Sequence, residues 1–175
     1  MTWPPARPRS LFHGTLHHHA TALQSGPVNL NLCRPDSDFG RGFYLTSNLS
    51  QACQWANTRV LPWQGPNQKK IAAVLEFEVD WNQLATRSDL ALVWEGAAPA
   101  SDYWLLVAHC RGGGLNRGTD QQAQYDVVYG PVSLWPQYLV IKDCDQVSFH
   151  TDRAIAILTA RTIVRSGSIA DPFVR

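Results

Sequence analysis

The chain has 175 residues, of which 45% are apolar and 17% are charged, and its formal net charge at pH 7 is +1. The length and the apolar content predict one domain with its own hydrophobic core. The near-zero net charge excludes a broad electrostatic attraction to nucleic acid or to an anionic membrane, although it is compatible with a local basic patch.

Two further features concern the compartment. No apolar run approaches the roughly 18 residues of a membrane-spanning helix, and the N-terminal MTWPPARPRS lacks the apolar segment of a secretory signal. The four cysteines are far apart and form no CxxC pair, which favours free thiols in a reducing compartment. We therefore expect a cytoplasmic protein with no membrane partner; delivery to a target cell by a route without a signal peptide also fits.

The first part of the chain alternates strand and helix patterns. In chain order we expect an irregular arm over 1–9, a short buried strand over 10–15, a helix that begins at 16 and stops at Gly26-Pro27, a loop over 29–37 and a strand over 42–46. Ser47 or Asn48 then caps a helix, because Asn48 and Gln51 have the spacing of a capping box. The buried face of that helix is expected to comprise Leu49, Ala52, Cys53 and Ala56.

The rest of the chain is expected to be richer in strands. Its predicted elements are a Pro/Gly loop over 61–70, a strand over 70–81, a helix over 101–111, a flexible Gly-rich segment over 112–124, strands over 125–132, 137–142 and 146–151, a helix over 152–164 and a flexible tail over 166–175. Strands and helices mix without regular βαβ alternation, which predicts an α+β fold with mainly antiparallel pairing.

Two motifs carry the functional signal. SLFHGT places His13 after an apolar strand and before Gly14, and FGRGFYLT places Tyr44 behind two glycines and ahead of a helix that contains Trp55. Together they resemble the ADP-ribosyltransferase superfamily, in the His-Tyr-acid branch of the poly(ADP-ribose) polymerase and diphtheria-toxin catalytic domains. A third segment, DQVSFHT, resembles the strand on which that branch places its final catalytic residue.

The chain is still more similar to a poorly characterised bacterial family with an ADP-ribosyltransferase-like fold, whose members carry HGT, DFGRGFYLT and QxSFHT. The resemblance covers roughly residues 10–160. It implies split, mainly antiparallel β-sheets with flanking helices, in a single catalytic domain over residues 10–165.

The resemblance also assigns roles in the first motif. His13 would form a hydrogen bond with a ribose hydroxyl on the adenosine side of NAD; the alternative is a core histidine at the end of a strand. Gly14 would let its backbone pair with the nicotinamide carboxamide, since a residue without a Cβ permits that approach. Thr15 would support this segment locally.

In the second motif, Tyr44 would stack on the nicotinamide ring. Trp55 would cover the other face of that ring, or would pack in the core of the amphipathic helix. Gly42 would bring the strand close to NAD. Arg41 would face the pyrophosphate, or would be an ordinary exposed arginine in a glycine turn.

The third catalytic position departs from the branch. A glutamate normally holds the ribose hydroxyls there, and this chain has Gln146 at the matching position. A neutral amide cannot take a proton from an acceptor hydroxyl. The expected catalytic residues are therefore His13, Tyr44 and Gln146, with NAD as co-substrate, no metal and no chain elongation; Glu76 or Glu78 is the next candidate if Gln146 is not the third residue.

The leading hypothesis is an NAD-dependent mono-ADP-ribosyltransferase, such as a bacterial toxin or effector, with a protein or nucleic-acid acceptor. Two alternatives stay open, namely an NAD glycohydrolase and a non-catalytic module that binds NAD or ADP-ribose. An RNA 2′-phosphotransferase of the same fold is disfavoured, because no cluster of basic residues is evident around the motifs. Since enzymes that consume NAD endanger their own cell, a neutralising antitoxin or immunity protein is a further expected partner.

Overall fold

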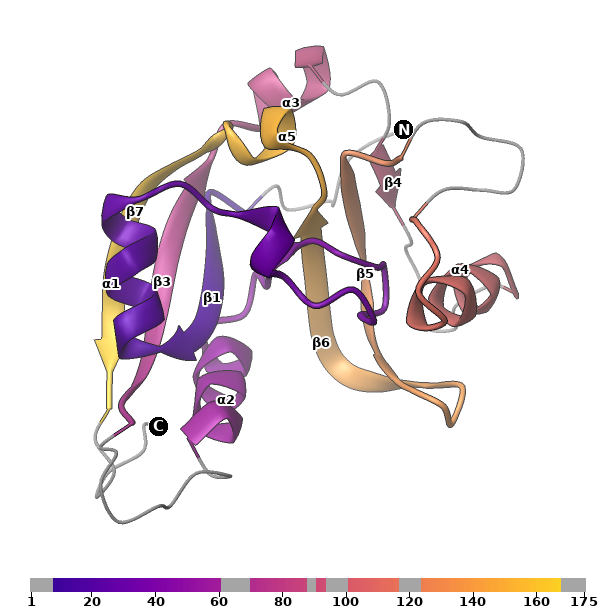
Figure 1. Cartoon of the computed structure of the whole chain (residues 1–175), viewed down its shortest axis with the longest axis horizontal. Coiled ribbons are helices and arrows are strands. Elements are labelled where there is room, and N and C mark those ends of the chain that lie inside the picture. The colour runs from indigo at the N-terminus through magenta and orange to yellow at the C-terminus, as the bar shows by residue number, and fades with distance from the viewer. Residues whose placement is uncertain (1–7, 61–69, 88–90, 94–100, 117–123, 168–175) are drawn as a thin grey trace. The chain divides into compact units, whose positions relative to one another are not determined.

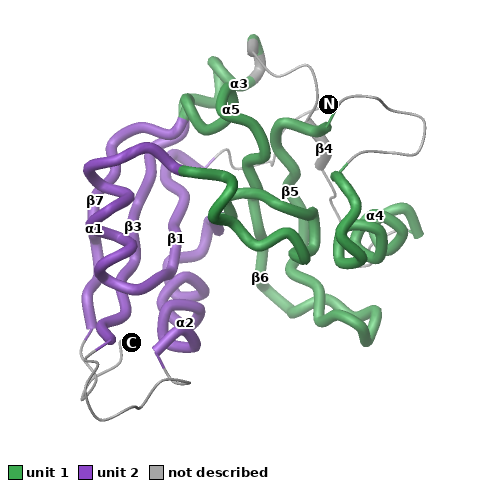
Figure 2. Tube along the Cα trace, viewed as in Figure 1, with its two compact units in different colours: residues 1–7, 29–44, 80–157 green, residues 8–28, 45–79, 158–175 purple. Residues whose placement is uncertain are grey.

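The computed structural model describes residues 8–60, 70–87, 91–93, 101–116 and 124–167. The helices and strands are labelled in Figure 1, and the chain forms two compact units, which are coloured separately in Figure 2. Unit 1 comprises residues 1–7, 29–44 and 80–157, and unit 2 comprises residues 8–28, 45–79 and 158–175. The expected α+β class is confirmed, because two small, mainly antiparallel sheets are combined with short helices.

Unit 2 is built on a three-stranded antiparallel sheet. Its central strand is β3 (Ala72–Val79), which pairs with β1 (Ser10–Leu16) on one side and with β7 (Leu158–Ser166) on the other. The first four residues of β3 are all buried, and burial then alternates through the LEFEV segment. This pattern fits a central strand that is covered on both faces at its start and on one face at its end.

Two helices pack on this sheet. Helix α1 (His17–Ser25) contacts β7 and β3, and α2 (Leu49–Val60) contacts β1 and β3. The expected cap of α2 is confirmed, because Oδ1 of Asn48 accepts from the backbone N–H groups of Ser50 and Gln51 at 2.9 and 3.2 Å. Gln51 closes the box indirectly, since its Oε1 accepts from the Thr46 hydroxyl at 3.0 Å.

The contact between α2 and β1 requires a glycine. Gly14 is buried, and a Cβ at this position would lie 2.9 Å from the backbone N of Ala56 and closer still to the carbonyl oxygen of Ala52. Ala52 and Ala56 are themselves 1% and 0% exposed. The backbone of the helix therefore lies directly against the backbone of the strand.

Unit 1 contains the second sheet, in the order β2-β6-β5-β4. Its strands are β2 (Phe43–Leu45), β4 (Ala91–Val93), β5 (Val127–Leu134) and β6 (Leu139–Phe149), and its helices are α3 (Trp81–Arg87), α4 (Ser101–Arg111) and α5 (Asp152–Ile155). β5 and β6 pair antiparallel, whereas β4 and β5 pair parallel. One cluster of buried core residues in this unit comprises Phe39, Tyr103, Leu106, Val107, Cys110 and Val128.

Two predicted elements are wrong. The expected helix over 152–164 is helical only in α5, and strand β7 begins at Leu158. This strand contains four β-branched residues, Thr159, Thr162, Ile163 and Val164, which favour extended backbone. The separate strands expected over 137–142 and 146–151 are one continuous strand, β6, which contains Asp143 with a φ of 57°.

The strand expected over 70–81 ends earlier than predicted. Asp80 follows β3, and its Oδ1 accepts from the backbone N–H groups of Asn82 and Gln83 at 3.1 and 3.0 Å, which caps α3. The arm up to residue 7, the loop over 61–69, residues 117–123 of the Gly-rich segment and the tail from 168 lie outside the described residues. None of the helices in the described part of the chain has the length and apolar character needed to cross a membrane.

We predict that Gly14→Ala destabilises the fold by about 3 kcal/mol, because the new methyl group would overlap the backbone of α2, which has no side-chain freedom to move aside. Urea unfolding followed by circular dichroism measures this loss. Gly112→Ala is the matched control, since its Cβ would meet its nearest atoms at an ordinary 3.4 Å. Equal stability of the two variants would contradict the close contact between α2 and β1.

Candidate functional site

A buried carboxylate organises the part of unit 1 that contains Gln146. Asp38 is only 3% exposed. Its Oδ1 accepts from Nε and Nη2 of Arg111 at 2.9 and 2.6 Å and from the Ser133 hydroxyl at 2.5 Å. Its Oδ2 accepts from the Ser133 backbone N–H at 2.8 Å and from Nε2 of Gln146 at 2.7 Å. We call Asp38, Arg111, Ser133 and Gln146 the Asp38 cluster.

The Asp38 cluster determines which end of the Gln146 amide can meet a ligand. Nε2 of Gln146 also donates to the carbonyl oxygen of Pro131 at 2.9 Å, and both of its partners are pure acceptors. Only the amide nitrogen can donate to these two acceptors, so the orientation of the Gln146 amide is fixed with its nitrogen toward Asp38 and Pro131. Among the described residues none donates to Oε1 of Gln146, so this oxygen is the atom that can accept a hydrogen bond from a ligand hydroxyl.

Tyr44 is held by the residue next to Asp38. Its hydroxyl accepts from the backbone N–H of Phe39 at 2.9 Å and donates to the carbonyl oxygen of Gly40 at 2.7 Å. Its ring packs nearly parallel to the Phe39 ring, with the centroids 6.4 Å apart. Burial raises the pKa of Tyr44 well above its usual value. The hydroxyl therefore stays neutral, and its two hydrogen bonds fix the position of the ring.

The glycines and the arginine of the GRG segment each have a structural role within unit 1. Gly40 has a φ of +78°, a left-handed conformation that favours glycine. A Cβ on Gly42 would lie 2.6 Å from Cε1 and Nδ1 of His150. Nη1 of Arg41 donates to the carbonyl oxygens of Asn31 and Cys33 at 2.8 and 2.7 Å, which holds the 3₁₀ turn Leu30–Leu32. In the structure GRG thus brings the backbone close to a histidine.

His150 is a residue that sequence reasoning missed as a candidate. It is 5% exposed and lies edge-on to the Tyr44 ring, with 6.2 Å between the ring centroids. Nδ1 lies 2.8 Å from the carbonyl oxygen of Arg41, so this nitrogen carries the proton, and Nε2 is left to accept from the Ser148 hydroxyl at 2.7 Å. Burial lowers the pKa of His150 to about 4. The available signal was its place directly after the strand in VSFHT.

The other candidates belong to unit 2. His13 is partly buried in β1 opposite Leu75, and Thr15 is 8% exposed opposite Ala73. Gly14 is explained by its contact with α2. Trp55 is 54% exposed on α2, so the alternative that it packs in the core is wrong. The proposed role of Trp55 against the nicotinamide ring stays a prediction.

The two glutamates and the histidine run lie on β3 and α1 of unit 2. Glu78 forms an exposed ion pair with Arg9 at 3.4 Å, and Glu76 lies two residues earlier in β3 with the same facing. His17, His18 and His19 form the first turn of α1. Across the described residues, no group of three or more His, Cys, Asp or Glu side chains is arranged to hold a metal ion.

The model of a family described as a protein of unknown function, DUF3990, matches residues 10–134. The match includes His13 and Tyr44 and ends before Gln146. No curated protein and no solved structure matches the chain.

We predict that Gln146→Glu destabilises unit 1 by about 3 kcal/mol, because a second carboxylate would face the Asp38 carboxylate and the Pro131 carbonyl, with no donor between them. Chemical denaturation at neutral pH measures the effect. Adding Asp38→Asn to this variant restores a donor and is expected to recover part of the loss. Gln83→Glu, on the exposed face of α3, is the matched control; the same loss there would mean that the Asp38 cluster is not the cause.

A second prediction concerns acid sensitivity. The pKa of His150 is about 4 in the folded chain against 6.5 for an ordinary histidine, so the unfolded state takes up the proton first as the pH falls. Stability present above pH 6.5 is therefore lost toward pH 4, and about 2 kcal/mol is expected to disappear between about pH 7 and pH 5. Denaturation curves at the two pH values measure it.

Two variants isolate this contribution. The Asn side chain in His150→Asn can still donate to the Arg41 carbonyl but does not titrate. Between pH 7 and pH 5 the free energy of unfolding of this variant should therefore fall by about 2 kcal/mol less than that of the parent. His18→Ala removes an exposed histidine and should behave as the parent does. A parent chain and His150→Asn variant that lose equal stability would show that His150 is not held neutral.

Proposed function

The chain belongs to the DUF3990 family, and we propose that it is an NAD-dependent mono-ADP-ribosyltransferase, which cuts the nicotinamide–ribose bond and transfers ADP-ribose to a macromolecular acceptor. The motifs around His13 and Tyr44 support this function by resemblance, and the two small antiparallel sheets are compatible with an ADP-ribosyltransferase-like fold. The observation that carries the proposal is local. Asp38 orients Gln146 while its neighbour Phe39 orients Tyr44.

Each of the three residues has a defined task in this proposal. The Tyr44 ring, fixed through its hydroxyl, stacks on the flat nicotinamide leaving group. Oε1 of Gln146 accepts from a ribose hydroxyl, since its nitrogen is already occupied. His13 forms a hydrogen bond with the adenosine-side ribose. The bond is broken through an oxocarbenium-like transition state, which is favoured by orienting the sugar and binding the leaving group.

The neutral amide limits what the acceptor can be. Gln146 cannot remove a proton from an attacking hydroxyl, and its nitrogen is turned toward Asp38 and Pro131. The acceptor must therefore bring its own nucleophile, such as a nitrogen or sulfur atom or a nucleic-acid base. We expect one ADP-ribose per site and no polymer, because elongation requires activation of a ribose hydroxyl.

A second candidate function is a module that binds NAD or ADP-ribose without chemistry. The observation that favours it is the same amide, because Gln146 shares its nitrogen with a structural cluster and places no carboxylate beside the sugar. Release of nicotinamide separates the two functions. NAD labelled in the adenine ring, incubated with protein and cell lysate, then distinguishes transfer to protein or nucleic acid from hydrolysis to free ADP-ribose.

We predict that His13→Ala and Tyr44→Ala each lower the rate of nicotinamide release by about 10²-fold, which corresponds to the loss of one hydrogen bond or stacking surface of roughly 1.5–3 kcal/mol. The assay is nicotinamide release from labelled NAD by variants whose folding is checked by circular dichroism.

Two matched controls accompany these variants. His17→Ala removes the next histidine along the chain and should leave turnover unchanged. Tyr44→Phe keeps the ring but loses the two hydrogen bonds that orient it, so it should lower turnover, by less than Tyr44→Ala does. A folded His13→Ala protein with parental turnover would remove the resemblance as a guide to the mechanism.

A further inference from the structure

Four chain segments meet at one end of the sheet in unit 2. The β1 and β3 strands pair Leu16 with Ala72, and β3 and β7 pair Ala73 with Ser166, so the end of β1, the start of β3 and the end of β7 coincide. The backbone N–H of His17 donates to the carbonyl oxygen of Ile71 at 2.7 Å, which places the start of α1 at the same end. Figure 1 shows these segments together at the lower end of the sheet.

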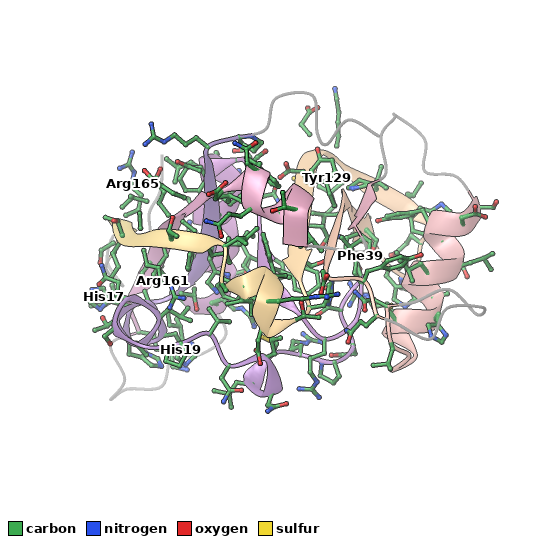
Figure 3. The ribbon with its side chains drawn as sticks, turned by 90° about the horizontal axis from the view of Figure 1, so that it is seen from above. His17, His19, Phe39, Tyr129, Arg161 and Arg165 are labelled. Atoms are coloured by element: carbon green, nitrogen blue, oxygen red, sulfur yellow. The ribbon has the colours of Figure 1, made fainter. Side chains whose placement is uncertain are left out.

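Basic side chains gather at this end of unit 2. Figure 3 labels His17 and His19 on α1, and Arg165 on β7. His19 has a lowered pKa, caused first by burial and then by the positive charges of His18, Arg59 and Lys70, so these groups lie near one another. Arg165 lies close enough to α2 for its charge to lower the pKa of the Cys53 thiol, against the larger effect of burial. We call His18, His19, Arg59, Lys70 and Arg165 the basic end.

Basic residues outnumber carboxylates in the described part of unit 2. The described part of this unit contains five Arg or Lys residues and two Glu residues, which leaves a net charge of +3 without the histidines. Both Glu residues lie toward the other end of β3, where Glu78 pairs with Arg9. Glu76 is four strand residues from Ala72, a distance of about 13 Å along the strand, and two strand residues from Val74, the partner of Arg165. The described part of the unit therefore carries an excess of positive charge.

Trp55 adds an exposed aromatic surface to this charge. The guanidinium carbon of Arg59 lies 5.4 Å from the centroid of the Trp55 ring, while 54% of the residue remains exposed. The cation covers part of the ring, and the open part can take a flat partner. Grooves for single-stranded nucleic acid combine such groups, with cations along the phosphates and aromatic rings under the bases.

We propose that the basic end and Trp55 form a binding site for single-stranded nucleic acid, in which Arg59, Lys70 and Arg165 contact phosphates and a base stacks on the Trp55 ring. The positive side chains of the basic end are complementary to the negative phosphates of a nucleic-acid backbone. A base-paired duplex would hide the faces of its bases from Trp55, and an acidic peptide would leave the ring without a planar partner. Binding at this site does not require NAD, so its test is independent of the proposed function.

Fluorescence anisotropy of a labelled oligothymidine of about 15 nucleotides tests the site with the full chain. Three phosphate contacts predict a slope of about −2 in log affinity against log salt, so affinity falls roughly 20-fold between 50 and 200 mM salt. Trp55→Ala should weaken binding at least 5-fold, which is the scale of one lost base stack. An abasic oligomer with the same number of phosphates should bind more weakly and should not distinguish Trp55→Ala from the parent.

Matched variants separate the site from general charge. Lys70→Ala and Arg165→Ala should each make the salt slope shallower by about 0.7. Arg9→Ala removes one charge at the opposite end of the sheet and should bind as the parent does. Trp55→Phe keeps a ring and should retain most of the affinity. An oligouridine probe beside the oligothymidine shows whether RNA or DNA is preferred, and either preference supports the site.

Several results would overturn the proposal. Equal binding of the abasic and base-containing oligomers, or parental affinity in Trp55→Ala, would exclude base stacking. Tighter binding of a duplex than of its single strands would also exclude it. A raised KM for NAD in Trp55→Ala, with unchanged oligonucleotide affinity, would return Trp55 to the nicotinamide pocket.

Discussion

The carboxylate of Asp38 is the group on which the organisation of unit 1 depends. It is a buried charge, and such a charge is tolerated only when a cation and hydrogen-bond donors replace its water. Arg111 from α4, Ser133 from β5 and Gln146 from β6 provide them, so one carboxylate joins a loop, a helix and two strands. Arg111 also donates to the Asp36 carbonyl at 3.0 Å, which fixes the approach of the loop.

The same charge determines the chemistry of its neighbours. Burial, reinforced by Asp38, raises the pKa of the Cys110 thiol to about 12 and raises the pKa of Tyr103 as well. Both groups stay protonated at neutral pH, so Cys110 is no nucleophile despite its place beside the cluster. Gln146 is the cluster member whose oxygen accepts from no described residue. The cluster therefore leaves an acceptor, and neither an acid nor a thiolate, for any ligand of this unit.

Much of unit 2 could be predicted from sequence, because its signals are local. The strand that contains His13, the cap at Asn48 and the buried Ala52 and Ala56 follow from short-range pattern and side-chain chemistry. The Asp38 cluster could not be predicted in this way, since Asp38 and Gln146 are 108 residues apart and only pairing of the strands brings them together. Strand β7 was mistaken for a helix because its apolar residues fit both periods over so short a run.

The motif glycines have packing partners in the protein besides the ligand that the resemblance implies. Gly14 and Gly42 were expected to let a ligand approach, yet each has a partner within its own unit, the backbone of α2 and the His150 ring. Packing alone accounts for both glycines, so they add no separate support for NAD. Such support comes from a group whose orientation is set while one of its atoms accepts from no described residue, namely Oε1 of Gln146.

The net charge of the chain does not describe the local distribution of charge in unit 2. A net charge of +1 excludes only a broad field, because salt limits electrostatic attraction to about 8 Å under physiological conditions. Within unit 2, Glu76 is farther than that along β3 from Ala72 and the Lys70 that precedes the strand, whereas Arg165 pairs with Val74 and lies nearer to Glu76. The electrostatic potential at a phosphate bound to this end thus depends on the charged residues that the strand register places nearby, and not on the net charge of the whole chain. The exposed Trp55 ring beside Arg59 then turns a local charge into a surface that can also select for an unpaired base.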